Sequence, residues 1–333
     1  MAPTATPTDC PDPDWLKELA TSTDRDEREL AASIDETSPH LLNILSLDDA
    51  VFVRANVAIN PNTPADVLTH LAADPEELVR ERVAYHDNTP PTALAALAND
   101  PHDSVKRHVA GNPNTHSDTL STLADDTDSG VRTRVAGHRN TPTATLTRLS
   151  GDTTESVRTV TAVNPNTSPV VLATLAEDTD VAVRYHVARN PNLSPEILTR
   201  LCADSETVVR MWVACNTSTQ PEALDCLARD PDSRVRIKVA GHPGTPTSTI
   251  RSLVHDTSDD VRTVASTSGR THCLRRYANT LTGHDRDQAL LLIETGFTGW
   301  PDDLHTLLAN QRAITGAHSL HPKSPFLDRG RLV

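Results

Sequence analysis

Two columns of oppositely charged side chains recur along this sequence every 26 residues, a column being the residues at one position in successive repeats. The acidic column is Asp48, Asp74, Asp100, Asp126, Asp152, Asp178, Asp204, Asp230 and Asp256. The basic column, offset by six residues, is Arg28, Arg54, Arg80, Lys106, Arg132, Arg158, Arg184, Arg210, Arg236 and Arg262. Such columns have the chemistry of a carboxylate array or of a row of phosphate-binding cations. A site is needed only once, so recurrence in every repeat predicts a structural role. We expect each Asp to cap a helix and each Arg to reach the caps of its own or the next repeat.

Asparagine forms a third column, at a position that the sequence predicts to be a corner before a helix. Its members are Asn62, Asn88, Asn114, Asn140, Asn166 and Asn192. Asparagine side chains satisfy backbone groups in turns and tolerate unusual backbone angles. The column therefore predicts a corner ladder of hydrogen bonds.

Three of the five cysteines, Cys202, Cys215 and Cys226, come from two adjoining repeats and could converge in space. Metal sites are usually marked by cysteines two to four residues apart, a spacing that these lack. Cys202 also takes a place that alanine holds in most repeats. We expect structural cysteines, no metal and no cofactor. The sequence also lacks a P-loop, a glycine-rich dinucleotide motif and G-x-S-x-G, so we expect no catalytic residues.

The candidate binding residues lie in two further columns, which helical periodicity turns away from the core. The first is Asn56, Arg82, His108, Arg134, Val160, His186, Trp212, Lys238 and Val264, and it holds no acid. The second is Ala55, Glu81, Arg107, Thr133, Thr159, Tyr185, Met211, Ile237 and Thr263, with one acid. Exposed Trp, Tyr, Met and Arg are enriched at binding hot spots. The predicted concave binding patch is Arg107, His108, Arg134, Tyr185, His186, Met211, Trp212 and Lys238. The alternative is that Trp212 folds back onto a neighbouring helix and the basic bias is chance.

The elements that must position these columns follow from one repeat. A leucine column runs through Leu19, Leu45, Leu71, Leu97, Leu123, Leu149, Leu175, Leu201, Leu227 and Leu253, and about ten repeats cover residues 9–268. In Pro61–His86, the pair Thr63-Pro64 predicts the start of a short helix that carries Leu68 and Leu71. Asp74-Pro75 then predicts the start of a second helix. One helix pair buries too little surface to fold alone, so the repeats must stack.

These repeats resemble the leucine-rich repeat variant family. The resemblance is carried by the run Asn164-Pro165-Asn166-Thr167-Ser168-Pro169, and then by Leu172, Leu175, Ala176, Asp178, Val183, Arg184, Val187 and Ala188. It covers about 260 of the 333 residues. It implies a right-handed, HEAT-like superhelical solenoid without sheet, in which an α-helix alternates with a short 3₁₀-type helix. The charged columns likewise resemble the Asp–Arg ladder of HEAT repeats. The founding member's iron–sulfur domain has no counterpart here, because Cys10 stands alone near the start.

Composition fits many small cores. Aromatic residues make up only 3% of the chain, too few for one large core. The net charge is −14, so nucleic acid is disfavoured as a partner. The sequence has no apolar run of the roughly 20 residues that span a membrane and no signal peptide at its start. The five cysteines lack the paired short spacings of a disulfide framework, which fits a reducing compartment. We therefore expect a cytoplasmic protein.

The expected domains are a disordered tail over 1–14, the repeat solenoid over 15–268, a helical C-terminal cap over 269–310 and a disordered tail over 311–333. In the cap, the helices are expected at Thr271–Leu281, Arg286–Thr295 and Pro301–Ala309. Phe297 and Trp300 belong to its concentrated apolar surface. The cap shields the last repeat or, alternatively, is a docking module.

The sequence thus predicts an all-α solenoid that acts as a non-enzymatic scaffold and binds a protein or peptide of unknown identity on its concave face. The alternative is a nucleic-acid-binding or DNA-repair solenoid, like the HEAT-type alkylpurine DNA glycosylases.

Overall fold

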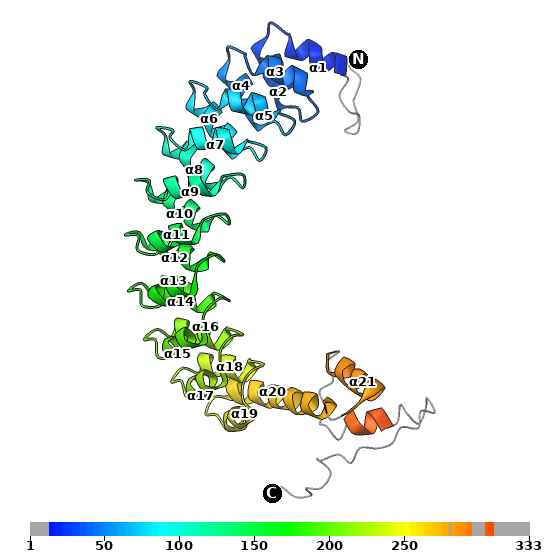
Figure 1. Cartoon of the computed structure of the whole chain (residues 1–333). Coiled ribbons are helices and arrows are strands. Elements are labelled where there is room, and N and C mark those ends of the chain that lie inside the picture. Colours follow the sequence, from blue (N-terminus) through cyan, green and yellow to red (C-terminus); the bar gives the residue numbers. More distant parts are fainter. Residues whose placement is uncertain (1–12, 280, 295–303, 310–333) are drawn as a thin grey trace, which may run out of the picture. The chain divides into compact units, whose positions relative to one another are not determined.

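The computed structural model describes residues 13–279, 281–294 and 304–309 (Figure 1). Every regular element in these ranges is a helix, which confirms the all-α repeat solenoid. The chain forms two compact units. The described part of unit 1 ends at Asn192, and unit 2 begins at Leu193. The predicted tails, 1–14 and 311–333, lie outside the described residues except for Pro13 and Asp14.

Unit 1 begins with α1 (Pro13–Ala20) and then alternates nine-residue and seven-residue helices, here called long and short helices. Its long helices are α2 (Arg25–Ser33), α4 (Val51–Ile59), α6 (Glu77–Tyr85), α8 (Asp103–Gly111), α10 (Ser129–Gly137), α12 (Glu155–Val163) and α14 (Val181–Arg189). Its short helices are α3 (Pro39–Leu45), α5 (Ala65–Leu71), α7 (Pro91–Leu97), α9 (Ser117–Leu123), α11 (Thr143–Leu149) and α13 (Pro169–Leu175).

Unit 2 continues the same alternation and ends with longer helices. Its short helices are α15 (Pro195–Leu201), α17 (Pro221–Leu227) and α19 (Thr247–Leu253). Its long helices are α16 (Thr207–Cys215) and α18 (Ser233–Gly241), followed by α20 (Asp259–Ala278), α21 (Gly283–Glu294) and a helix over 304–309. No helix in the described ranges is both long enough and apolar enough to cross a membrane.

The short helices are α-helical, although the family resemblance implied 3₁₀ geometry for them. In α5 the Leu68 amide bonds the Pro64 carbonyl at 3.0 Å, which is the i to i−4 pattern of an α-helix. Tighter i to i−3 bonds run from Ala73 to His70 and from Asp74 to Leu71, where the chain leaves the helix. In α5 the exit turn therefore has 3₁₀ character.

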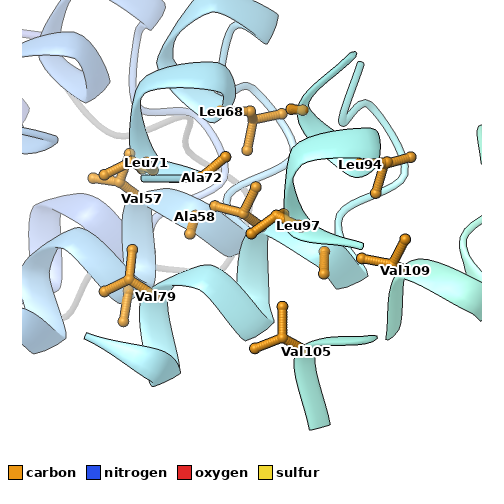
Figure 2. Packing of buried hydrophobic residues seen from close by; sticks show 14 of the residues in the cluster. Val57, Ala58, Leu68, Leu71, Ala72, Val79, Leu94, Leu97, Val105 and Val109 are labelled. Atoms are coloured by element: carbon orange, nitrogen blue, oxygen red, sulfur yellow. The ribbon is translucent and has the colours of Figure 1, made fainter. Parts of the chain in front are cut away.

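The core is a chain of small clusters shared between neighbouring repeats (Figure 2). Leu68 and Leu71 from a short helix meet Val79 and Val83 from the following long helix, and all four are at most 1% exposed. Figure 2 shows the corresponding side chains of the neighbouring repeats beside them, including Val57 and Leu94. Because each cluster draws on adjacent repeats, no repeat completes its core alone.

Neighbouring repeats of unit 1 approach each other most closely on the long-helix side. From α2 to α14, each long helix packs extensively against the next long helix. Successive short helices make few such contacts. Side chains that project from adjacent long helices are therefore close enough to meet one ligand.

The C-terminal part departs from the predicted cap at its start. Thr271–Leu281 is not a separate helix, because α20 runs unbroken from Asp259 to Ala278. Gly269 marks the point where the periodicity fails, but it does not end the helix. A Cβ atom there would lie 3.2 Å from Ile250 Cγ2, so this glycine allows α20 to pass close to α19.

The second and third predicted C-terminal helices are present as α21 and the helix over 304–309. A small cluster joins them to the end of α20, and its buried members are Ala278, Leu281, Ala289, Ile293, Leu304 and Leu308. Phe297 and Trp300 lie outside the described residues.

Candidate binding surface on the long helices

The charged columns form a ladder that ties successive repeats together. In one rung, Arg80 Nε donates to Asp100 Oδ2 in the next repeat at 2.6 Å, and Arg80 Nη1 donates to the Asp74 carbonyl of its own repeat at 2.8 Å. The expected structural role is confirmed. The capping geometry differs: Asp74 Oδ1 accepts the amide of Glu76, and α6 begins only at Glu77. The carboxylate thus closes a turn before the helix and is not itself the N-cap residue.

The same pairing recurs through both units. The rungs are Arg28–Asp48, Arg54–Asp74, Arg80–Asp100, Lys106–Asp126, Arg132–Asp152, Arg158–Asp178, Arg210–Asp230 and Arg236–Asp256. Burial by itself would raise the pKa of Asp100, but the hydrogen bonds from Arg80 bring that pKa below its ordinary value. Each rung neutralises its own charges, so the ladder offers neither a carboxylate array nor a phosphate site.

The asparagine column forms the expected corner ladder. Asn166 Nδ2 donates to the Arg139 carbonyl at 2.6 Å, and Asn192 Nδ2 donates to the Pro165 carbonyl at 3.0 Å. Both acceptors lie one repeat earlier. The side chains therefore join successive corners of unit 1.

A second corner column escaped prediction from the sequence because its members are of two residue types. They are Asn60, His86, Asn112, His138, Asn164, Asn190, Asn216 and His242, all buried. His138 Nδ1 accepts the Asn140 amide at 3.0 Å, so Nε2 carries the proton and donates to the Asn112 carbonyl at 2.9 Å. Asn112 Oδ1 accepts the Asn114 amide in the same way, and Nδ2 donates to the Ala84 carbonyl. The 26-residue spacing was the available signal, but an amide and an imidazole do not look alike in a sequence.

In unit 1, two residues of the predicted patch already have acidic partners. Arg107 on α8 donates to both carboxylate oxygens of Asp128, at 2.9 and 2.8 Å. Those bonds lower the pKa of Asp128 to about 2. His108 Nε2 lies 3.1 Å from Glu81 Oε1. Counting acids within the two columns therefore overestimates the free positive charge of the patch. Asp128, which neutralises Arg107, lies in the corner before α10 and belongs to neither column.

The remaining unit 1 residues of the patch lie on α10 and α14. Arg134 is exposed, and its guanidinium has no hydrogen-bond or ion-pair partner among the described residues. Tyr185 is half-buried, with the Arg189 guanidinium 5.4 Å above its ring and 3.2 Å from its hydroxyl. His186 lies beside it, with the two ring centroids 4.7 Å apart.

In unit 2, the three predicted residues lie on α16 and α18. Met211 and Trp212 are half-buried, and Lys238 is exposed. The structure therefore presents the predicted residues as two sets, one on the long helices of each unit.

Comparison with known proteins bears on these repeats directly. A family model described as leucine rich repeat variant matches residues 51–76 and 181–206, a single repeat in each case. A solved structure described as a leucine-rich repeat variant with a novel repetitive structural motif is 26% identical, with a TM-score of 0.53. That match covers 67% of this chain and 88% of the other.

The two matched segments are repeats of the leucine-rich repeat variant type. A second solved structure, described as an engineered protein, is 18% identical over 77% of this chain and 97% of that chain, with a TM-score of 0.38. No curated protein matches this chain.

The three cysteines of the repeats differ in environment. Cys202 is buried and lies 3.8 Å from the Ala223 carbonyl, and burial raises the pKa of its thiol to about 12. Cys215 is half-buried and Cys226 is exposed on α17, and all three are free thiols. The expected packing role therefore fits Cys202. Among the described residues, no cluster of three His, Cys, Asp or Glu side chains could hold a metal ion.

Proposed function

We propose that this chain is a non-enzymatic scaffold that binds a protein or peptide on the exposed face of its long helices. The observation that supports this proposal most is that the repeats differ mainly at positions that do not hold the fold together. The Leu, Val, Asp, Arg and Asn columns are occupied in packing and in joining one repeat to the next. The outward positions of the long helices are left to vary, and they hold Arg134 and Tyr185 in unit 1 and Trp212 in unit 2.

Two features of unit 1 support this proposal. The long helices form its more closely packed side, so neighbouring outward side chains can contact one extended ligand. Tyr185 makes an edge-to-face contact with His186 and is covered by Arg189, which holds its ring in one orientation. A rigid aromatic side chain loses little conformational entropy on binding and is a common hot spot.

The alternative nucleic-acid function gains no support from the geometry. Arg107 and His108, which made the predicted patch basic, are paired with Asp128 and Glu81. A chain of net charge −14 in whose patch these two side chains already have acidic partners is a poor match for a polyphosphate backbone.

Affinity capture from the native cell extract, with purified variants, tests the proposed scaffold. Tyr185→Ala in unit 1 and Trp212→Ala with Lys238→Glu in unit 2 each change long-helix residues. We expect at least one of these variants to lose the partner that the wild-type chain captures, by tenfold or more. The matched controls are Arg148→Glu on α11 and Arg251→Glu on α19, exposed positions on short helices. A partner lost by the short-helix variants and kept by all long-helix variants would contradict the proposal.

A further inference from the structure

We infer that a pocket at the ends of α8 and α10 in unit 1 binds a carboxylate side chain of an acidic peptide segment. This inference rests on the proposed scaffold function and names its ligand class. The pocket has a volume of about 510 Å³ and is lined by Gly111, Pro113, Arg134, Gly137, His138 and Arg139.

The pocket exists because two successive long helices end in glycine. The preceding long helices, α4 and α6, end with Ile59 and Tyr85, and α12 ends with Val163; all three side chains are exposed. Neither Gly111 nor Gly137 has a positive φ angle, so the backbone does not require glycine there. What glycine provides is room: a Cβ at Gly111 would lie 3.1 Å from Arg134 Nη1.

The two guanidinium groups at this pocket are free, which sets them apart within unit 1. All other described arginines of that unit donate from the side chain to a carboxylate, a carbonyl or another side chain; they are Arg25, Arg28, Arg54, Arg80, Arg82, Arg107, Arg132, Arg148, Arg158, Arg184 and Arg189. Arg134 and Arg139 have no such partner in the described chain. The free positive charge of unit 1's arginines is thus concentrated at one pocket.

The surrounding polar groups leave these cations available to a ligand. The Asn112 and His138 carbonyls near the pocket are already acceptors, for His138 Nε2 and Asn164 Nδ2 respectively. Burial lowers the pKa of the His138 imidazole, and the charge of Arg139 lowers it further. His138 is therefore neutral at pH 7 and does not compete for an anion.

A carboxylate fits the two guanidinium groups, and the apolar residues on either side of the pocket favour a peptide over a polyphosphate. A guanidinium bonds both oxygens of a carboxylate in one plane, and two guanidinium groups can hold one or two such side chains. Tyr85, 68% exposed with its ring 5.6 Å from that of His108, lies one repeat before the pocket, and exposed Val163 lies one repeat after it. An acidic peptide with apolar residues next to its acids can contact both side chains, whereas a phosphodiester backbone has no apolar groups to place on them.

Fluorescence anisotropy with labelled peptides tests the pocket. The probe has three glutamates among leucine and phenylalanine residues, its control has glutamine for every glutamate, and a uridine oligonucleotide of equal charge is the third ligand. We expect the full chain to bind the glutamate peptide at least tenfold more tightly than the other two. Arg134→Gln with Arg139→Gln should remove that preference. Gly111→Tyr should remove it too, because it fills the pocket with the residue type that ends α6 at the equivalent position, Tyr85. Binding should also raise the pKa of His138, measured by NMR.

Two matched variants control for general effects. Arg251→Gln removes an exposed, unpartnered cation of α19 in unit 2, and Gly241→Tyr fills the equivalent end of α18, so both should retain the preference. Equal binding of the two peptides, tighter binding of the oligonucleotide, or an equal loss in the controls would overturn the pocket assignment. If the wild-type chain still captures a cellular partner through Tyr185 or Trp212 in that case, the scaffold function stands without the pocket. If only the peptide preference is found, the pocket stands without that function.

Discussion

An amide and an imidazole have two hydrogen bonds in common at the corners of this chain. Asparagine accepts through Oδ1 and donates through Nδ2, as Asn164 does toward the Asn166 amide and the His138 carbonyl, and Asn164 also donates to the Ala136 carbonyl. Histidine does both only as the neutral tautomer protonated on Nε2. The Asn residues are therefore indifferent to acid, whereas each His loses its acceptor when the ring is protonated.

His138 allows this equivalence to be tested. His138→Asn should keep the free energy of unfolding at pH 7.5 within about 1 kcal/mol of wild type, whereas His138→Ala should lower it by about 1–3 kcal/mol, because buried partners are left unsatisfied. The pKa of His138 lies below its ordinary 6.5 in the folded state, so the unfolded chain binds more protons and stability falls as the pH drops below about 7. Urea unfolding at pH 7.5 and 5.5 should show a smaller loss for His138→Asn. An equal loss in both proteins would contradict the tautomer assignment.

The candidate residues show how far single positions could be predicted. The sequence identified Tyr185 and Arg134 as outward-facing, but it could not predict that Asp128 would neutralise Arg107. That pair joins the middle of one helix to the corner before the next, 21 residues apart, and no column contains both. The pocket at Arg134 also escaped prediction, because it depends on two missing side chains, at Gly111 and Gly137.

At the scale of the element, the sequence located the short helices closely and the long helices less well. Thr63-Pro64 does precede α5, which starts at Ala65. Asp74-Pro75 precedes α6 by a full turn, because Asp74 bonds the Glu76 amide and delays the helix. The predicted separate helix Thr271–Leu281 was wrong, because α20 runs unbroken through Gly269, and close packing against Ile250 accounts for this glycine.

The charged ladder contains its own natural variant, since Lys106 stands where the other repeats have arginine. Its ammonium bonds Asp126 at 2.6 Å, but it does not reproduce the carbonyl bonds that Arg158 makes to Asp152 and Thr153. Arg158→Lys should therefore lower the free energy of unfolding by about 1 kcal/mol, and Arg158→Ala by about 2–4 kcal/mol, because Asp178 loses its partner.

Lys106→Arg is the converse change and should stabilise by about 0.5–1 kcal/mol, as the new guanidinium reaches the Asp100 and Pro101 carbonyls. Urea midpoints of the four proteins should rank Lys106→Arg, wild type, Arg158→Lys, Arg158→Ala. If Lys106→Arg proved destabilising, the carbonyl bonds would not be the source of the arginine preference.

At the scale of the whole chain, the acid response should reflect two sets of groups. His138 and His242 have pKa values below 6.5 in the folded state, and Asp48, Asp100, Asp128, Asp152, Asp178 and Asp256 have pKa values below 3.8. Both sets stabilise the fold when deprotonated. Their contributions are full above the unfolded pKa and are lost as the pH falls through and below it.

We therefore expect the urea midpoint, followed by circular dichroism in moderate salt, to fall slightly between pH 7 and 5.5 and steeply below pH 4. His138→Asn should reduce the first step and leave the second unchanged. A midpoint that held constant down to pH 3 would show that the ladder carboxylates do not stabilise the fold.

The two ladders point in opposite directions along the chain, and this bears on how such an array can evolve. In the described rungs each arginine finds its carboxylate in the following repeat, whereas each corner Asn or His finds its carbonyl in the preceding one. A copied inner repeat would therefore bring a partner for both neighbours, and tandem duplication or deletion of 26 codons would leave no polar group stranded. The first and last repeats each lack one of these bonds to a neighbour. Ile34 stands where the inner repeats have Asn or His, and Arg262 pairs with Asp259 on its own helix. The length of the array is thus free to change from the inside, while its two ends are fixed in composition.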